Sequence, residues 1–597
     1  MQGMHWLISR SAHRVDGRHT ALALCLSFGL SISAVMPAIS QTADLSEFDE
    51  MLGAGKYQEA VPALTEAVDK ARLESKDPYK IVSLLERIAI AERRMARYKD
   101  ADTHLKMAMG MIRQKPSDAA QAESKARMLF NLADLLDEMG LSREASFVGK
   151  QGIEAVRALE LAGSLPYLET ELLNITARIE IQQGELEQAA DSLSEAAYMA
   201  DSLSDEPTEV MVPASIMARS KAYLKGKILA TEAMLNQVTG KLDKARALNA
   251  RAEELLIAAA RSEIKDHRYA GLHARFSRAV KKAGDADPTE PFLAEIDKDF
   301  GSDSLVKASA LDIVAQYELD KSRLKESRAH LEKALSIREA LLPKKSIERL
   351  LNQVALSELD LKEGKLKDAA TKAMDGYNGL ETSAGPQSPA FGKAAVALAN
   401  IYMSAGQYKS VGPVLTRAWS IQGKVYGPES PEVLDVLDAM TRLNLRSKDY
   451  KKTIQLGAPL TVSMEKLYGA RSPRLVPSLT ATGTAYAYLR KSDKARQNLL
   501  RAKTILESAG KKKSTEYGEV LAGLGINDTL QYKWKTASVY LKDAIGVYSS
   551  LYGESHPSTL AMKSLYKSMD TKAHSSPVPT HNLLLYKKYT PMAPNQR

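Results

Sequence analysis

The chain has little cysteine and few large aromatic residues. Its 597 residues include a single cysteine, Cys25, eight phenylalanines and three tryptophans. One thiol cannot form a disulfide within the chain, so stability has to come from packing. Hydrophobic residues nevertheless make up 44% of the sequence. The predicted core therefore consists mainly of Ala, Leu, Ile, Val and Met side chains.

Residue patterns that support catalysis are also absent. Glu263 and His267 have the spacing of a pair on one helix face, but two groups are too few for a metal site. The run 511–515 lacks the glycine spacing and the preceding strand of a phosphate-binding loop. The other histidines of the repeats stand singly, and His556, directly before Pro557, is expected to cap a helix. We therefore expect a protein that is not an enzyme and that binds no cofactor and no metal ion.

The charge distribution does not indicate nucleic-acid binding. Lysine and arginine number 82 against 73 aspartates and glutamates, which gives a net charge of +9. Basic and acidic residues alternate along expected outer helix faces, as between Lys241 and Glu254, and this is typical of a solvated, ion-paired surface. A nucleic-acid-binding surface would need a basic stripe with stacking aromatic residues, which the sequence lacks.

The second half of the chain contains three columns of mostly small residues that recur every 42 positions. The middle column consists of Ser327, Ala369, Val411, Thr453, Ala495 and Ala537. Seven residues later come Ala334, Gly376, Ala418, Leu460, Ala502 and Ala544. Twelve residues before the middle column come Ala315, Ser357, Ala399, Thr441, Gly483 and Gly525. These columns predict repeated pairs of closely packed helices, stacked as a solenoid in which each unit buries its apolar face against its neighbours.

The same columns continue into the first half with less regular spacing. The middle column there consists of Ala60, Ala101, Ala145, Ala189 and Ala245. The gap of 82 residues between Ala245 and Ser327 is close to two units. It predicts a degenerate unit, with helices near 267–283 and 290–300. Together these spacings predict an all-α fold of roughly twelve helix pairs.

These columns resemble the tetratricopeptide repeat (TPR). The matching stretch is Leu398-Ala399-Asn400-Ile401-Tyr402, followed by a turn with Gly406. Glycines such as Gly184 and Gly364 occupy the same turn, where a first helix is expected to end in left-handed or tightly packed backbone. Between units, a Tyr-Gly-x-x-x-Pro turn recurs at 426–431, 468–473 and 552–557. With the long spacing, this turn resembles the kinesin light chain-like subtype of the family.

The resemblance implies a right-handed α-solenoid of antiparallel helix pairs, a TPR superhelix. In such proteins the concave groove is lined by the first helix of each pair and holds peptides or partner helices. We expect an irregular array over 44–303, with its degenerate unit near 267–300, and a regular array over 304–573 that ends in a capping helix near 557–572. A Pro/Ser-rich tail, 574–597, follows, and its apolar-basic cluster 583–589 either docks on the last repeat or serves as a linear motif.

The first forty residues differ in character from the repeats. Arg10, Arg14 and Arg18 precede an uncharged run from Thr20 to Met36, and small residues follow at 38 and 40. This pattern predicts a secretory signal peptide over 1–40. The alternative is an uncleaved N-terminal anchor helix. Either way the repeats would lie outside the cytoplasm, in a periplasmic or secreted protein, and a cleaved signal would leave no stable membrane span.

The outward positions of the first helices supply the candidate binding residues, because they change character from unit to unit while the core columns stay small or apolar. The patch with the most charged and polar residues consists of Lys393, Asn400, Asp438, Arg442, Arg446, Thr480, Thr484 and Tyr488. Arg442 and Arg446 lie one helical turn apart, and we expect them to hold a carboxylate of an acidic or polar partner segment. Asn400 is expected to bond a peptide backbone.

These expectations favour a non-enzymatic, exported scaffold that binds a partner protein or peptide in its groove. The alternative is an accessory or regulatory subunit of a cell-envelope or polysaccharide-processing enzyme complex. A carbohydrate platform would need exposed aromatic residues, and the expected groove offers mainly Tyr488. The sequence predicts neither the identity of the partner nor the oligomeric state.

Overall fold

The computed structural model describes residues 45–74, 78–112, 119–158, 165–204, 221–239, 241–260, 271–284, 286–321 and 323–574. The expected signal peptide, the tail after 574, Glu263 and His267 lie outside these residues. The contacts described below lie within 51–597, which form one unit. No helix in the described ranges is long and apolar enough to cross a membrane.

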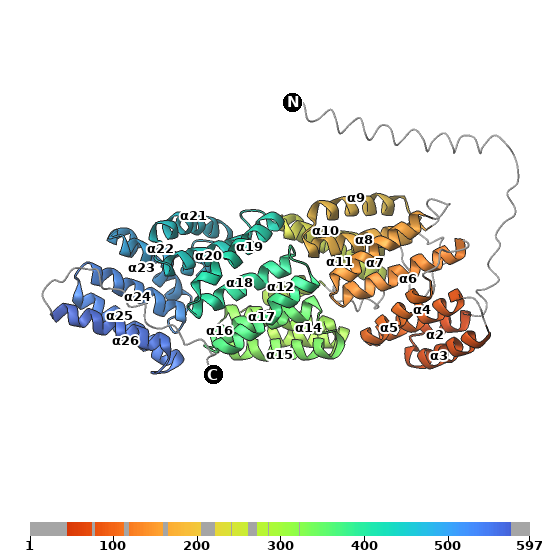
Figure 1. Ribbon diagram of the computed structural model, residues 1–597, viewed down its shortest axis with the longest axis horizontal. Coiled ribbons are helices and arrows are strands. Elements are labelled where there is room, and N and C mark those ends of the chain that lie inside the picture. Colours follow the sequence, from red (N-terminus) through yellow and green to blue (C-terminus); the bar gives the residue numbers. More distant parts are fainter. Residues whose placement is uncertain are drawn as a thin grey trace, which may run out of the picture. The chain divides into compact units, whose positions relative to one another are not determined.

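The described part of the chain consists of helices in consecutive pairs (Figure 1). The first helices of the pairs are α2 (Ser46–Gly53), α4 (Pro78–Arg94), α6 (Ala119–Glu138), α8 (Pro166–Gln183), α10 (Lys221–Val238), α12 (Leu272–Ala283), α14 (Leu305–Asp320), α16 (Ile347–Lys362), α18 (Pro389–Ser404), α20 (Pro431–Arg446), α22 (Val476–Tyr488, after the short 3-10 helix η2, Pro473–Leu475) and α24 (Thr515–Leu530).

Each first helix is followed by the second helix of its pair. The second helices are α3 (Tyr57–Glu74), α5 (Tyr98–Met111), α7 (Ser142–Arg157), α9 (Leu186–Ser202), α11 (Leu242–Ala260), α13 (Thr289–Phe300), α15 (Leu324–Leu341), α17 (Leu366–Ser383), α19 (Tyr408–Tyr426), α21 (Tyr450–Tyr468), α23 (Ser492–Ser508) and α25 (Trp534–Tyr552). A last helix, α26 (Pro557–His574), stands where the capping helix was predicted. The helices expected near 267–283 and 290–300 are α12 and α13.

The pairs stack as a solenoid. In the regular part, α16, α18, α20 and α22 each pack against the second helix of their own pair and against the first helix of the next, and α24 packs against α25. Such a stack keeps nearly all contacts between neighbours in sequence. The predicted all-α solenoid of antiparallel helix pairs is therefore confirmed.

The columns of small residues mark the places where the two helices of a pair approach most closely. Ser327, Ala369 and Ala495 are fully buried. A Cβ atom at Gly376 would lie 2.5 Å from Cγ2 of Val354, and one at Gly483 would lie 2.8 Å from Cγ of Leu499. The close approach that the sequence predicted from these columns is thus confirmed.

Serine residues cap many of the first helices, a signal that the sequence prediction did not use. Serine recurs every 42 residues at 304, 346, 388, 430, 472 and 514, and His556 takes the next position. Ser388 accepts a hydrogen bond from the Phe391 N–H at 3.2 Å. Nδ1 of His556 accepts one from the Ser558 N–H, also at 3.2 Å, so its predicted capping role is confirmed. These caps satisfy N–H groups that the first turn of a helix leaves unbonded.

The turn inside each pair needs one residue with left-handed backbone. Glycine supplies it in α8/α9 and α16/α17, with φ of +81° at Gly184 and +78° at Gly364, as the sequence predicted. In α20/α21 and α22/α23 the same position holds Lys448 and Arg490, with φ of +64° and +60°. Residues with a Cβ atom strain the backbone there.

Turns far apart in the sequence also contact each other. The Ile347 N–H donates to the carbonyl of Gly140 at 3.0 Å, and Lys345 pairs with Glu144. Helix α8 contacts α18, and Gly184 at its end lies close to Gln387. Early pairs of the array are thus held against later pairs through their turns.

Candidate binding face on the first helices

We define the first-helix face by fixed positions on consecutive first helices, counted from the small residue in the middle of each helix. In the regular half the positions that matter here hold Glu358, Lys393, Asn400, Glu432, Asp435, Asp438, Arg442, Arg446, Arg474, Thr480, Thr484, Tyr488 and Glu519. They belong to α16, α18, α20, η2, α22 and α24. Side chains spaced in this way can contact an extended ligand along several consecutive units.

Three of the predicted residues form one bonded group. Nε of Arg442 donates to Oδ2 of Asp438 at 2.8 Å, and Nη2 donates to Oδ1 of Asn400 at 3.0 Å. The group links α18 to α20. Because the bonds hold its guanidinium in place, Arg442 is oriented before any ligand arrives.

Arg446 and Tyr488 are held by neighbours as well. Nη2 of Arg446 donates to Oε1 of Glu519 on α24 at 3.4 Å, and the Tyr488 ring stacks on Tyr450 with centroids 4.6 Å apart. Both arginines that the sequence assigned to an acidic ligand therefore already face carboxylates of the chain. The structure gives no added support to an acidic partner.

The two threonines of the predicted patch do not lie on its open surface. Thr480 is 7% exposed and Thr484 is 8% exposed. The Thr480 hydroxyl donates to the carbonyl of Val476 at 2.7 Å. Their expected role as exposed polar contacts is corrected, because both fill space between helices.

Lys393 remains exposed, and it lies beside carboxylates that the predicted patch left out. These are Glu358 on α16, together with Glu432 and Asp435 on α20. The positive charge of Lys393 lowers the pKa of both glutamates, although burial raises each pKa more strongly. Two of the three acids could have been found from sequence, since Glu358 shares the register position of Arg442 and Asp435 shares that of Lys393.

Asp435 also has a raised pKa. Its side chain is exposed. The surrounding helices nevertheless displace part of its water, and this desolvation raises its pKa to about 6. Repulsion from Asp438, Glu432 and Glu358 adds to the shift, and Arg474 opposes it. Carboxylates of α16 and α20, two units apart, thus act on one another.

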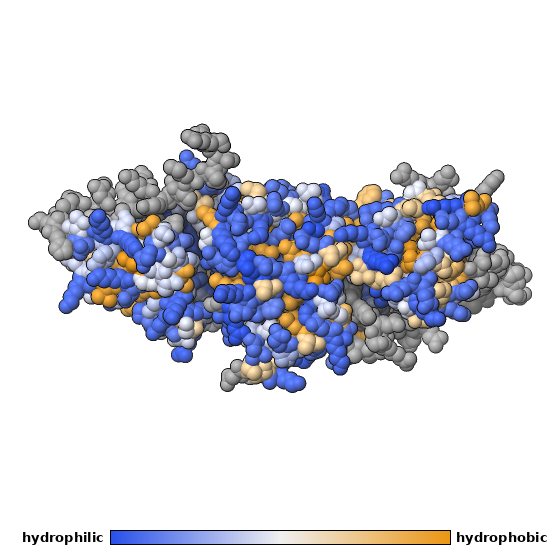
Figure 2. All heavy atoms as spheres, turned by 90° about the horizontal axis from the view of Figure 1, so that it is seen from below, coloured by the Kyte–Doolittle hydropathy of each residue, from blue (hydrophilic) through white to orange (hydrophobic). Residues whose placement is uncertain are grey.

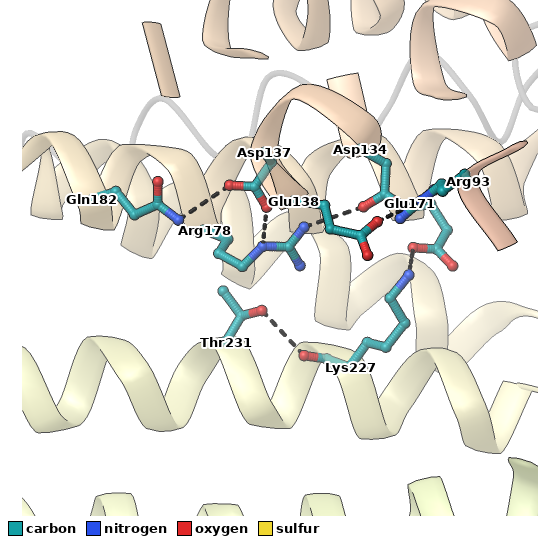
Figure 3. A network of polar contacts seen from close by, with 9 residues as sticks. All are labelled: Arg93, Asp134, Asp137, Glu138, Glu171, Arg178, Gln182, Lys227 and Thr231. Atoms are coloured by element: carbon teal, nitrogen blue, oxygen red, sulfur yellow. Dashed lines mark hydrogen bonds and ion pairs between the residues drawn. The ribbon is translucent and has the colours of Figure 1, made fainter. Parts of the chain in front are cut away.

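First helices of the first half form a buried polar network, which in part uses the same register positions (Figure 3). Nε of Arg178 donates to Oδ2 of Asp137 at 2.6 Å, and its Nη2 lies 3.3 Å from Oδ1 of Asp134. Arg93 bonds both Asp134, at 2.7 Å, and Glu138. The network joins α4, α6 and α8.

A second pair continues the network to α10. Nζ of Lys227 lies 2.5 Å from Oε2 of Glu171, and both residues are buried. Figure 3 shows the two side chains pointing toward each other from α10 and α8. These charges bond neighbouring units, so charged side chains of the first helices are buried in this half. In the regular half several of them, such as Lys393, Asp435 and Arg446, are exposed.

Exposed apolar surface is limited. On the side shown in Figure 2, hydrophilic residues predominate and hydrophobic ones show in narrow bands between them. In the part of the chain that the structure describes, the exposed large hydrophobic residues include Leu73, Phe147, Tyr198 and Val462, which lie on different second helices. The side shown therefore offers mainly polar groups for recognition.

In comparisons with known proteins, the chain resembles solved structures at a distance. No protein-family model matches the chain, and no curated protein matches it. The Rap protein complexed with Competence and Sporulation Factor is 11% identical, with a TM-score of 0.36 and coverage of 68% of this chain and 99% of that chain. The APC/C hetero-tetramer Cut9–Hcn1 is 11% identical, with a TM-score of 0.43 and coverage of 89% of this chain and 96% of that chain. Likenesses this distant do not bear on function.

Proposed function

We propose that the chain is a non-enzymatic scaffold that binds a segment of a partner protein along the first-helix face of α16 to α24. The observation that carries the proposal is the row of accessible charged and polar groups from Glu358 to Glu519. Several of them are fixed by bonds between neighbouring units, as in the Arg442–Asn400 contact. Prearranged groups lose little conformational entropy when a ligand binds.

The spacing of these groups favours binding over catalysis. They are distributed over successive units of the solenoid, whereas a catalytic site needs a nucleophile, a base and an orienting group within hydrogen-bond reach of one reacting atom. A distributed row matches an extended chain instead, with one set of contacts for each unit. Resemblance to the TPR family adds an expectation of the same kind and leaves the partner open.

Photo-crosslinking tests the proposal with little disturbance of the fold. A photoreactive amino acid replaces the exposed Lys393 on the face, and in a control it replaces Lys452 on second helix α21, whose side chain is 67% exposed. Purified full-length protein is irradiated in extracts of the compartment in which it occurs. We expect a discrete partner crosslinked from position 393 and not from position 452. Identical products from both positions, or none from 393, would contradict the proposal.

Export is a separate part of the proposal. The arginines before residue 20, the uncharged run and the small residues at 38 and 40 favour removal of a signal peptide and a place outside the cytoplasm. N-terminal sequencing of the protein from its source cells decides this point. A mature chain that starts near Gln41 supports export, and a chain that starts at Met1 in the cytoplasm contradicts it.

A further inference from the structure

Negative charge on the first-helix face is compensated incompletely. Glu358, Glu432 and Asp435 form no ion pair with any residue that the structure describes. Asp438 bonds Arg442 through Oδ2, while its buried Oδ1 has no hydrogen-bond partner among the described residues. A buried carboxylate oxygen without a donor is costly, so this acid can accept a further bond. Four acceptors of one charge sign therefore lie on two first helices.

The cations beside them are partly engaged elsewhere. Arg442 is shared between Asp438 and Asn400. Arg474 donates to the Tyr468 hydroxyl at 3.2 Å and lies over the Tyr468 ring, 4.8 Å from its centroid. Lys393 is exposed and forms no ion pair with the described residues. A fourth cation, Lys362, lowers the pKa of Glu358 but forms no ion pair with the described residues. None of these four cations forms an ion pair with Glu358, Glu432 or Asp435.

Burial and mutual repulsion both disfavour the charged forms of these acids, and the repulsion acts on Asp435. Burial raises the pKa of Glu358, Glu432 and Asp438, and Asp435 is affected by the charges of all three. A cation placed among them would remove repulsion and replace lost water contacts. Charge complementarity therefore selects a positively charged occupant, not the acidic segment expected from Arg442 and Arg446.

We infer that this face binds a basic segment, with lysine or arginine side chains placed among Glu358, Glu432 and Asp435. The inference rests on the proposed scaffold function and names the chemistry of its partner. Arginine suits such a site, because its planar donors can bond two carboxylate oxygens at once. Lys393 would set the register, since it repels a cation at its own position.

Peptide binding to the full-length protein tests the charge preference. The probe is a short fluorescent peptide of Lys, Ser and Gly, and its counterpart has Glu in place of each Lys. Fluorescence anisotropy is measured near physiological ionic strength, where the Debye length is about 8 Å, so that distant charges contribute little. We expect binding of the basic peptide and none of the acidic one. Preference for the acidic peptide, or equal binding of both, overturns the inference.

Neutral variants locate the site. Glu432→Gln with Asp435→Asn removes two charges from the face but keeps the size of each side chain. Glu326→Gln with Asp368→Asn removes the same charge from exposed positions on second helices α15 and α17. We expect the first variant to weaken binding of the basic peptide by about tenfold and the second to leave it unchanged. Equal weakening in both places the binding elsewhere and overturns the inference.

The crosslinking experiment separates this inference from the scaffold proposal. A partner that crosslinks from position 393 through an acidic segment would leave the scaffold in place and refute the basic chemistry. If no partner crosslinks and neither peptide binds, both proposals fail. Thermal unfolding of every variant checks that a loss of binding does not reflect a loss of fold.

Discussion

The two halves of the solenoid use the same register positions in opposite ways. In the early units these positions hold Glu171, Arg178 and Lys227, which are buried and bonded to neighbouring first helices. In the later units they hold Lys393, Asp435 and Arg442, which remain accessible to solvent in part or in full. A position that faces a ligand in one unit can thus bond two units together in another. Repeat register alone does not tell which of these roles a residue has.

Burial decides the energetic difference between the halves. Removing one partner of a buried ion pair leaves an uncompensated charge and costs about 3–5 kcal/mol. Removing an exposed charge changes stability by about 0–1 kcal/mol. The early face therefore contributes to stability, whereas substitutions on the later face should act mainly on binding.

The largest effect is expected from Lys227, compared with Lys393 at the same register position. Lys227→Met removes the cation that is bonded to the buried carboxylate of Glu171, and we expect a loss of about 3–5 kcal/mol in the free energy of unfolding. Lys393→Met should change it by less than about 1 kcal/mol. Urea denaturation with hydrogen exchange of the α8 and α10 amides measures both.

A double substitution sharpens this prediction. Lys227→Met with Glu171→Gln removes both charges, and it should recover much of the stability that the single substitution loses. If the single and double variants are equally unstable, lost packing and not the unpaired charge explains the effect.

The next largest effect concerns the contact between early and late turns. Gly184 and Gly427 both have φ of +81°, so Ala should strain the backbone by about 1–2 kcal/mol at either position. At Gly184 the new Cβ would also lie 2.9 Å from the Gln387 carbonyl oxygen, whereas at Gly427 it meets nothing within 4 Å.

We therefore expect Gly184→Ala to destabilise the protein by about 1–3 kcal/mol more than Gly427→Ala. Faster hydrogen exchange at the start of α18 should accompany the loss. Equal effects of the two substitutions would show that the contact between the turns contributes no stability.

The open face should respond to pH through Asp435. Its pKa is about 6 in the folded protein, above the usual 3.8, so the folded state binds more protons than the unfolded state between these two values. Stability should then rise as pH falls through this window, and Asp435→Asn should remove this contribution. Because the side chain is exposed, the expected gain between pH 7 and pH 4 is at most about 1 kcal/mol.

Affinity for the basic peptide should have the opposite pH dependence from stability. Protonation of Asp435 weakens its attraction for a basic peptide, so affinity should fall below about pH 6. The groups that act on Asp435 are Arg474 and the three carboxylates of Glu358, Glu432 and Asp438. Parallel titrations of the parent and Asp435→Asn separate its contribution from theirs. A parent affinity that stays constant between pH 7 and pH 5 would contradict the role of this acid.

The sequence predicted the fold more fully than the site, for a physical reason. Small residues such as Ala399 and Gly483 are required wherever two helices touch, so their spacing shows in the sequence directly. The spacing of charged residues does not show whether their side chains are buried or exposed. Arg178 and Arg442 share a register position, but one is 1% exposed at its side chain and the other 35%. That difference depends on how neighbouring units pack around each residue after folding, and no local sequence pattern encodes this packing.

The prediction of the patch was incomplete for the same reason. Exposure of Thr480 was inferred from its place in a column, yet the neighbouring helices bury it. Arg442 and Arg446 were assigned to a ligand because their partners, Asp438 and Glu519, become neighbours only after folding. Glu432 lies outside the chosen columns, and only the structure brings it beside Lys393.

The smallest effect is expected at the turns inside the later pairs. Lys448 has φ of +64°, a conformation that costs a residue with a Cβ atom about 1–2 kcal/mol. Glycine removes this strain but gains conformational freedom in the unfolded chain, which costs about 0.5–1 kcal/mol. Lys448→Gly should therefore stabilise the protein by about 0.5 kcal/mol in urea denaturation. Gly406→Ala, at the equivalent turn one pair earlier with φ of +73°, should destabilise it by a similar amount. If Lys448→Gly destabilises instead, the lysine side chain contributes more to this turn than its backbone strain costs.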